Sequence, residues 1–202
     1  WQTVIPDQRR ISKIDLSDDY LQAIRLYASC ADELKSSELY RNDLIEFVSY
    51  YVAAKAENFY KQALKDDSEN RVLAAQRNLQ QTVDLLMDVD KLLASHPLYR
   101  LEEWVELARN SGTTLQEKDA YEANAKRLIT SWGGIQEDYA ARFWSGLIKD
   151  YYIPRIQLYF TKGRNKIREW EEQWITSPWS NSTTPFDDPV EAALSLIEKT
   201  NK

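Results

Sequence analysis

Glycine and proline are scarce in this chain, with only 5 Gly and 6 Pro in 202 residues. A β-rich fold needs many tight turns, and these two residues are among those that most often make them. Long stretches without either residue, with apolar side chains three or four positions apart, favour long helices instead. We therefore predict an all-α fold, a helical bundle or array of roughly six to eight helices with antiparallel neighbours.

Capping residues and apolar spacing together place the expected helices. The clearest one starts after Ser36 or Ser37 and keeps a three-four apolar spacing over roughly 28 residues. A second long helix follows the break at residues 67–70 and ends before His96-Pro97, so the two should pack antiparallel. Further helices are expected over residues 17–34, 101–109, 115–131, 156–175 and 188–200. Another should begin at residue 136 or 137 and continue until Pro154 stops or kinks it.

The two ends of the chain suggest how it is organised. It begins Trp1-Gln2-Thr3 without a methionine, which suggests an excised piece of a longer polypeptide. Residues 1–15 are expected to form an extended lead-in from a missing upstream domain, and residues 16–202 a single helical domain.

Charge and the rarest residue types exclude several classes of function. The formal charge of −6 should repel nucleic acids and anionic membranes, and no apolar run is long enough to span a bilayer. A single cysteine and a single histidine cannot build a disulfide, a thiolate cluster or a histidine-rich metal site, so no cofactor or metal is expected. We expect Cys30 to be buried on a helix and His96 to be solvated in a loop.

The segment from Ile129 to Arg155 is the most distinctive part of the chain. It holds two Trp, three Tyr, an acidic pair and three of the five glycines. Aromatic rings and short carboxylates beside a Gly-Gly break are what a sugar-facing surface uses. Aromatic residues at helical spacing are also compatible with a helix that fills a core, and residue types alone favour this packing interpretation. Gly146, in the middle of the expected helix, indicates close approach of another backbone.

Catalysis by this chain alone is not supported. The sequence contains no glycine-rich phosphate loop, nucleophile elbow or His-Glu-x-x-His motif, which leaves paired carboxylates. The candidate pairs, Glu102-Glu103 and Glu137-Asp138, are adjacent residues, and adjacent side chains on a helix point about 100° apart. Acidic residues are also common in first helical turns, where they face the positive end of the helix dipole.

The order and spacing of several short motifs resemble a known family. These motifs are Ala120-Tyr121-Glu122-Ala123-Asn124, Trp132-Gly133, Asp138-Tyr139-Ala140, Ser145-Gly146-Leu147 and Tyr151-Tyr152-Ile153-Pro154-Arg155. They are similar to the C-terminal helical domain of the α-N-acetylglucosaminidases, glycoside hydrolase family 89. The resemblance implies that two catalytic glutamates lie on an upstream (β/α) barrel that this chain lacks. It also implies that the whole enzyme removes terminal α-linked N-acetylglucosamine, from heparan sulfate in animals or from other glycans in bacteria, outside the cytoplasm.

The resemblance also assigns roles to single residues. Trp132 would form part of the sugar-pocket wall, Tyr139 would lie near the bound sugar, and Gly133 would let the backbone pass close. Asn124 and Asp138 would be polar supports. The chain departs from the family at Ala141, Phe143 and Ile156, where the family has Asn, Gln and Trp.

Two functions are therefore weighed. The first is an accessory domain that packs on the catalytic barrel, binds the glycan through one wall of the pocket, and is not catalytic alone. Such a domain should leave an apolar surface exposed, to which Trp1, Trp174 and Trp179 could contribute. The alternative is a free-standing helical protein-interaction scaffold with no ligand site.

Overall fold

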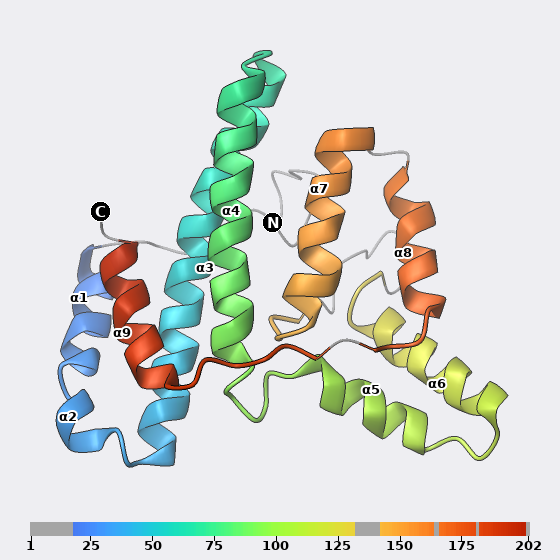
Figure 1. Ribbon diagram of the computed structural model, residues 1–202, viewed down its shortest axis with the longest axis horizontal. Coiled ribbons are helices and arrows are strands. Elements are labelled where there is room, and N and C mark those ends of the chain that lie inside the picture. The colour runs from blue at the N-terminus through green and yellow to red at the C-terminus, as the bar shows by residue number, and fades with distance from the viewer. Residues whose placement is uncertain (1–17, 132–141, 164–165, 181, 201–202) are drawn as a thin grey trace. The chain divides into compact units, whose positions relative to one another are not determined.

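The computed structural model describes residues 18–131, 142–163, 166–180 and 182–200 of the chain. Within these ranges the regular structure is helical, and the only β-type pairing is an isolated parallel bridge between Arg100 and Ser145 (Figure 1). The all-α prediction is confirmed. No helix among the described residues is both long and apolar enough to cross a membrane.

Contacts divide the described chain into two compact units. The hairpin unit comprises residues 18–98 and 184–200, and the motif unit comprises the described residues of 99–183. The hairpin unit contains α1 (Asp18–Ala28), α2 (Ala31–Leu34), α3 (Glu38–Ser68), α4 (Val72–Leu93) and α9 (Pro189–Lys199). The motif unit contains α5 (Leu101–Asn110), α6 (Leu115–Leu128), the π-helix η2 (Ile148–Tyr152), α7 (Ile153–Lys162) and α8 (Ile167–Thr176).

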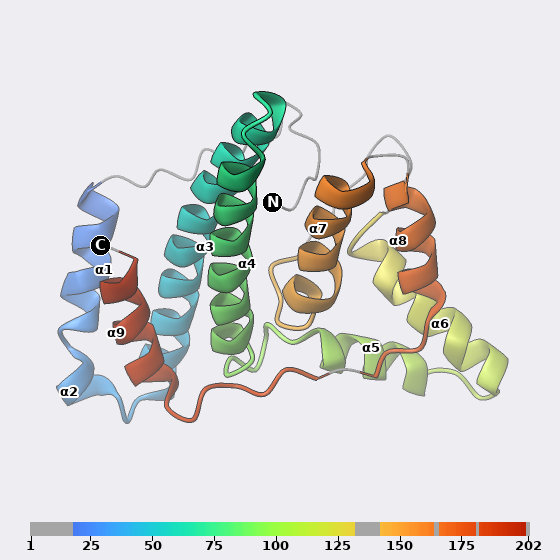
Figure 2. The ribbon, with the colours of Figure 1, turned by 45° about the horizontal axis from the view of Figure 1, so that its top comes forward.

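The hairpin unit is built on α3 and α4, which lie side by side as an antiparallel pair (Figures 1 and 2). Ser37 caps α3, and its hydroxyl accepts a hydrogen bond from the Tyr40 amide at 3.4 Å. The core between the two helices is mainly apolar, with the fully buried Leu44, Val48, Leu86 and Val89 among its members. Apolar spacing therefore predicted both helices and their pairing correctly.

A polar network closes the turn between α3 and α4. The buried Asp66 carboxylate accepts hydrogen bonds from Arg71 at 2.5 Å, Gln62 at 2.8 Å and Asn78 at 2.7 Å. These donors hold the pKa of Asp66 below its usual range, with Arg71 as the largest cause. Asn70 takes a left-handed conformation with φ 58°, which asparagine tolerates better than most residues. The turn is thus fixed by side chains from both helices.

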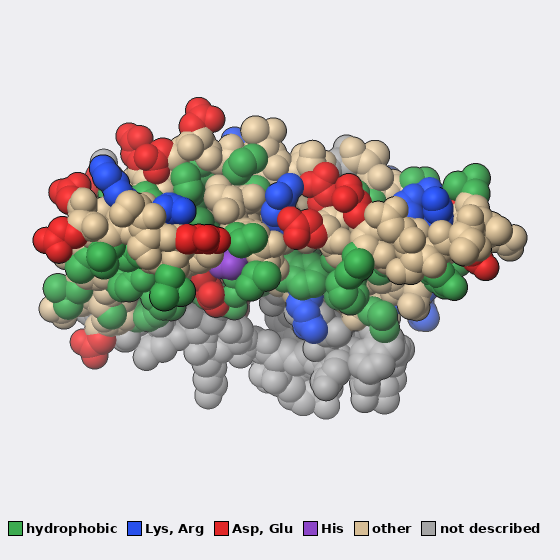
Figure 3. Space-filling model, turned by 90° about the horizontal axis from the view of Figure 1, so that it is seen from below, with side chains coloured by type: hydrophobic (Ala, Val, Ile, Leu, Met, Phe, Trp, Pro, Cys, Tyr) green, Lys and Arg blue, Asp and Glu red, His purple; other side chains and the backbone are tan. Residues whose placement is uncertain are grey.

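Short helices complete the hairpin unit next to α3. The Tyr27 ring of α1 stacks on Tyr40 of α3 with centroids 4.9 Å apart, and its hydroxyl donates to Asp43 at 3.3 Å. Asp188 caps α9 by accepting from the amides of Val190 and Glu191. Figure 3 shows hydrophobic side chains gathered where α2 and the start of α3 lie, and Leu39 there is 71% exposed.

In the motif unit, α5 and α6 form a second helical pair. Thr114 caps α6 with a complete capping box: its hydroxyl accepts from the Glu117 amide, and the Glu117 carboxylate accepts from the Thr114 amide. The predicted boundaries of α5 and α6 agree with the structure to within three residues.

The helix expected to run through residues 143–151 is wrong for residues 143–146, whereas residues 147–151 are helical. Residues 142–145 are not helical, and Gly146 has φ +83°, which a right-handed helix cannot accommodate. Ser145 instead pairs with the chain before α5: its amide donates to Tyr99 O at 2.8 Å, and Leu101 N donates to its carbonyl at 3.0 Å. The aromatic spacing that mimicked a helix comes partly from Trp144, whose ring contacts Trp104 with centroids 6.1 Å apart.

Helical structure begins instead as a π-turn just before Pro154. The Ile153 amide donates to Ile148 O, five residues back. In an α-helix the Pro154 ring would clash with the carbonyl four residues back, and the wider π-turn relieves that clash. Pro154 then sits in the first turn of α7, where proline is tolerated because that N–H needs no intrahelical acceptor.

Other expected helices are interrupted. The segment 17–34 breaks after Ala28, and the segment 156–175 breaks at Gly163, which has φ 73°. The early end of α1 leaves Cys30 exposed, which corrects the expectation that it is buried. His96 was expected to be solvated but is buried: its Nδ1 accepts from Leu98 N at 3.1 Å, and burial lowers its pKa.

Candidate functional site

Most of the predicted sugar-binding residues lie outside the described residues. Trp132, Gly133, Asp138 and Tyr139 all fall within 132–141. Asn124 is described, and it is exposed on the surface of α6. The structure therefore bears on the site through the residues that flank this segment.

Both flanks of the segment are anchored within the motif unit. On one side, Ile129 and Thr130 are buried, and the Thr130 hydroxyl donates to Lys126 O at 2.7 Å. On the other side, Ser145 is buried and paired with the backbone at Tyr99 and Leu101. The described chain before and after residues 132–141 is thus held by the packed structure.

Gly146 is in close contact with two side chains. A Cβ atom placed there would lie 3.1 Å from the Trp179 ring and 3.3 Å from Leu101 Cβ. The predicted close approach is therefore real, but the approaching groups are side chains, chiefly an indole, and not a backbone. The positive φ gives a second reason for glycine at this position.

A buried ionic cluster ties α6 to the chain that follows α8. Glu122 on α6 is buried and accepts from Arg109 of α5 at 2.7 Å, from Lys126 at 3.2 Å and from the Trp179 backbone amide. A buried carboxylate is stable only with such partners, because desolvation disfavours its charged form. Glu122 therefore fixes the backbone that places the Trp179 ring over Gly146.

Lys126 completes this cluster. Its amino group also donates to Trp174 O at 3.1 Å and to Ser177 O, and it lies over the Trp174 ring, 5.2 Å from the centroid. Burial lowers the pKa of Lys126, while the Glu122 carboxylate raises it and partly offsets that effect. With the side chain only 2% exposed, Lys126 connects the end of α8 to α6 and does not act as a surface charge.

The Tyr-Tyr-x-Pro-Arg motif has a structural role in the described chain. Glu171 of α8 accepts from the Tyr151 hydroxyl at 2.9 Å and pairs with Arg155 Nε at 2.6 Å. Arg155 also lies over the Tyr151 ring, 5.4 Å from its centroid. All three side chains are buried, so the motif joins η2 and α7 to α8.

A pocket of about 360 Å³ opens next to these two clusters, and we call it the tryptophan pocket. It lies entirely within the motif unit. Its lining residues are Lys126, Asp150, Pro154, Trp170, Trp174, Ser177, Pro178, Trp179 and Ser180. Two tryptophans expected on an exposed apolar surface, Trp174 and Trp179, therefore line this pocket, while Trp1 lies outside the described residues.

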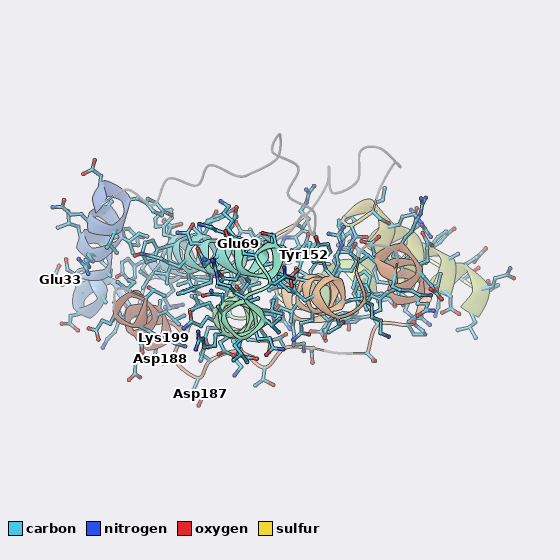
Figure 4. All side chains as sticks on the ribbon, turned by 90° about the horizontal axis from the view of Figure 1, so that it is seen from above. Glu33, Glu69, Tyr152, Asp187, Asp188 and Lys199 are labelled. Carbon is cyan, nitrogen blue, oxygen red and sulfur yellow. The ribbon has the colours of Figure 1, made fainter. Side chains whose placement is uncertain are left out.

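The hairpin unit has a different, acidic pocket beside α9. Asp187, Asp188 and Lys199 line it, and they lie on one side of the molecule in Figure 4. Its charges already have structural roles, because Lys199 pairs with Asp88 at 2.6 Å and Asp188 caps α9. Among the described residues, no group of three or more His, Cys, Asp or Glu could hold a metal ion.

The carboxylates of Glu102 and Glu103 form ion pairs at the start of α5. Both side chains pair with Arg100, at 2.9 Å and 3.5 Å. They lie in the first turn of α5, as the dipole argument predicted. The second pair, Glu137-Asp138, lies outside the described residues.

Comparison with known proteins gives a family for this arrangement. Residues 8–199 match the family model of the alpha-N-acetylglucosaminidase (NAGLU) C-terminal domain. The chain belongs to this family. It is also 31% identical over 144 residues to human alpha-N-acetylglucosaminidase, a match that covers 70% of this chain and 19% of the human protein.

Solved structures agree with this membership at the level of fold. The NAGLU C-terminal domain described here is similar to a family 89 glycoside hydrolase from Clostridium perfringens in complex with PUGNAc, with a TM-score of 0.76 and 22% identity. A variant of that bacterial enzyme in complex with GlcNAc-alpha-1,4-galactose gives a TM-score of 0.73. Each match covers 88% of this chain and 23% of the bacterial one, so the chain spans less than a quarter of these relatives.

Sequence reasoning missed the residues that organise this NAGLU C-terminal domain. Glu122 lies inside a motif that the resemblance singled out, but the predicted role went to its neighbour Asn124. The four-residue spacing of Glu122 and Lys126 on one helix was a usable signal for the ion pair. Nothing in the sequence linked Glu171 to Tyr151, because that contact joins residues 20 positions apart.

Proposed function

We propose that this chain is an accessory domain of an α-N-acetylglucosaminidase-like glycoside hydrolase. In this proposal it packs on a catalytic (β/α) barrel of the same polypeptide and supplies one wall of the sugar pocket. The residues proposed to contact or support the sugar are Trp132, Gly133, Asp138, Tyr139 and Asn124. Its glycan carries terminal α-linked N-acetylglucosamine, and the whole enzyme works outside the cytoplasm. Residues 16–202 act together as one domain.

The anchoring of both flanks of residues 132–141 is the observation that carries this proposal. A wall that contributes to a sugar pocket must present its side chains at fixed positions, because catalysis depends on geometry already in place. Thr130 and Ser145 provide such fixed ends, and the Glu122 cluster holds the indole that packs on Gly146. Family membership and the substrate named for the bacterial relative support the choice of sugar.

The proposal assigns no catalytic residue to this chain. Among the described carboxylates, Glu102 and Glu103 serve one arginine, and Glu122 and Glu171 are buried in ion pairs. We therefore expect the 202-residue chain alone not to hydrolyse an aryl α-N-acetylglucosaminide. Hydrolysis by the isolated chain would contradict the accessory role.

The decisive experiment uses the polypeptide in which this chain is joined to its barrel. Trp132→Ala and Tyr139→Phe should each lower kcat/KM for an aryl α-N-acetylglucosaminide, on the order of a hundredfold for Trp132→Ala. Tyr121→Ala is the control, because Tyr121 is an exposed aromatic of the same unit, outside residues 132–141. Unchanged kcat/KM in both site variants would reject the wall role and favour the interaction-scaffold alternative.

A further inference from the structure

We propose that the tryptophan pocket binds a neutral saccharide ring. This inference goes beyond the proposed function, because its pocket is lined by residues of α6, η2, α7, α8 and the chain after α8 and by no residue of 132–141. Four observations on the described residues carry it, and they concern ring placement, unused hydrogen-bond donors, charge and size.

The indole rings of the pocket are held in place without a ligand. Trp170 and Trp174 both contact the buried Tyr151 ring, with centroids 5.6 Å and 4.7 Å away. Trp179 is fixed through its backbone amide on Glu122 and through its ring against Gly146. A rigid aromatic platform loses little conformational entropy when a ligand binds, which favours binding.

The indole N–H groups of the same three tryptophans have no acceptor among the residues that the structure describes. Within the described residues, the indole N–H of Trp104 donates to Ala125 O at 3.1 Å. The indole N–H groups of Trp170, Trp174 and Trp179 have no acceptor there, and all three side chains are partly exposed. An indole with an apolar face and an available N–H suits a ligand with C–H faces and hydroxyl oxygens, which is the chemistry of a pyranose.

Charge argues for a neutral sugar over an acidic one. The Lys126 amino group already contacts three oxygens, from Glu122, Trp174 and Ser177, so it is not available to a sulfate or carboxylate. The other titratable group that lines the pocket is Asp150, which adds no positive charge to attract an anion. Lys149, 3.7 Å from Asp150, does not line the pocket.

The size of the pocket fits one ring. A volume of about 360 Å³ lies near the lower end of the range typical of small-molecule pockets, roughly 300 to 1,000 Å³. Ser180 and the prolines Pro154 and Pro178 also line the pocket, so its lining contains both polar and apolar groups.

The test follows the indole N–H signals of the full chain by ¹H–¹⁵N NMR. N-acetylglucosamine and galactose serve as neutral probes, and N-acetylglucosamine 6-sulfate serves as the charged probe. We expect saturable shifts of the Trp170, Trp174 and Trp179 signals with the neutral sugars, weaker binding of the sulfated sugar, and no shift at Trp104. Absence of saturable shifts, or tighter binding of the sulfated sugar, would overturn the proposal.

Matched variants separate binding from folding. Trp170→Phe should lower the affinity for the neutral sugars roughly tenfold, because it removes one hydrogen-bond donor and part of one aromatic ring. Trp104→Phe makes the same replacement outside the pocket and should leave affinity unchanged. Ser180→Phe is a second variant at an exposed position, and its larger side chain should block binding while the far-UV circular dichroism stays unchanged. Full affinity in a folded Ser180→Phe chain would place the sugar elsewhere.

One further variant keeps this proposal distinguishable from the proposed function. Trp132→Ala should abolish the wall role in the parent enzyme but leave sugar shifts at the tryptophan pocket intact. Loss of those shifts in Trp132→Ala would mean that the observed binding belongs to residues 132–141, and the pocket assignment would then be wrong.

Discussion

At the centre of the hairpin unit most buried side chains are apolar, among them Leu44, Val48, Leu86 and Val89, whereas the motif unit buries the ion pair of Glu122 and Lys126. The difference follows from backbone geometry. Two long helices satisfy their own backbone groups, so only apolar faces need to meet. The motif unit contains irregular chain at residues 177–180, where the Ser177 carbonyl and the Trp179 amide take side-chain partners. Apolar side chains dominate the packing of the two long helices, whereas buried charged side chains hold the chain that follows α8.

The largest loss of stability is expected from a substitution in the apolar core of the hairpin unit. Leu44→Ala should lower the free energy of unfolding by about 4 kcal/mol, because it removes a fully buried side chain and leaves a cavity. Urea denaturation measures the loss, and native-state hydrogen exchange should locate it in α3 and α4. Leu39→Ala, 71% exposed on the same helix, is the control and should change stability by less than about 0.5 kcal/mol. Equal losses in the two variants would contradict the apolar-core account.

The second effect tests the buried charge of the motif unit. Lys126→Met should lower the free energy of unfolding by about 3 kcal/mol. Methionine fills similar space, but Glu122 and the carbonyls of Trp174 and Ser177 lose the amino group that donates to them. Hydrogen exchange should rise in α6 and α8. Lys118→Met, on the same helix without these contacts, is the matched control. If Lys126→Met were as stable as the parent chain, the cluster would not be what holds the chain after α8.

A smaller effect is expected at Gly146. Gly146→Ala should lower the free energy of unfolding by about 2 kcal/mol, because alanine is strained at φ +83° and its Cβ would lie too close to the Trp179 ring. Gly163→Ala meets no atom within 4 Å, but φ 73° with ψ 179° is a conformation essentially restricted to glycine, so its loss of about 1 to 3 kcal/mol comes from the backbone alone. Thermal unfolding of both variants, followed by circular dichroism, measures the two losses. An unchanged melting temperature in Gly146→Ala would contradict the account given for Gly146.

The smallest effect is a pH dependence in the hairpin unit. Burial, with the Asp43 carboxylate as a further cause, raises the pKa of Tyr27 from 10.0 to about 12. The folded state therefore holds this proton more tightly than the unfolded state. The stability it contributes is fully present below pH 10 and is lost as the pH rises to about 12. In urea titrations, Tyr27→Phe should lose less stability than the parent chain over this range, and parallel pH profiles would contradict the assignment.

Much of the fold was predictable because it follows from local rules. Caps at Ser37 and Thr114 and the apolar spacing after each of them located α3 and α6. The region around Gly146 was not predictable in the same way. Its aromatic residues have helical spacing, but Trp144 contacts Trp104, 40 positions earlier, and Gly146 contacts Trp179, 33 positions later, and only the folded chain brings these residues together.

The candidate site was predictable only through motif order. Order and spacing gave the family, which the comparison confirmed. The roles of Trp132 and Tyr139 remain predictions, since both lie outside the described residues. Asn124 was selected as a polar support because it belongs to a motif, whereas its neighbour Glu122 makes the buried contacts.

The sequence by itself determined that the chain is helical, where its long helices begin, and to which family it belongs, because caps, apolar spacing and motif order are local properties. Only the tertiary structure decided which charges are buried and what they hold. Glu122 and Glu171 look like ordinary helix-surface acids in the sequence. They become structural because folding brings Arg109, Trp179, Tyr151 and Arg155 to them, and a carboxylate removed from water requires such partners.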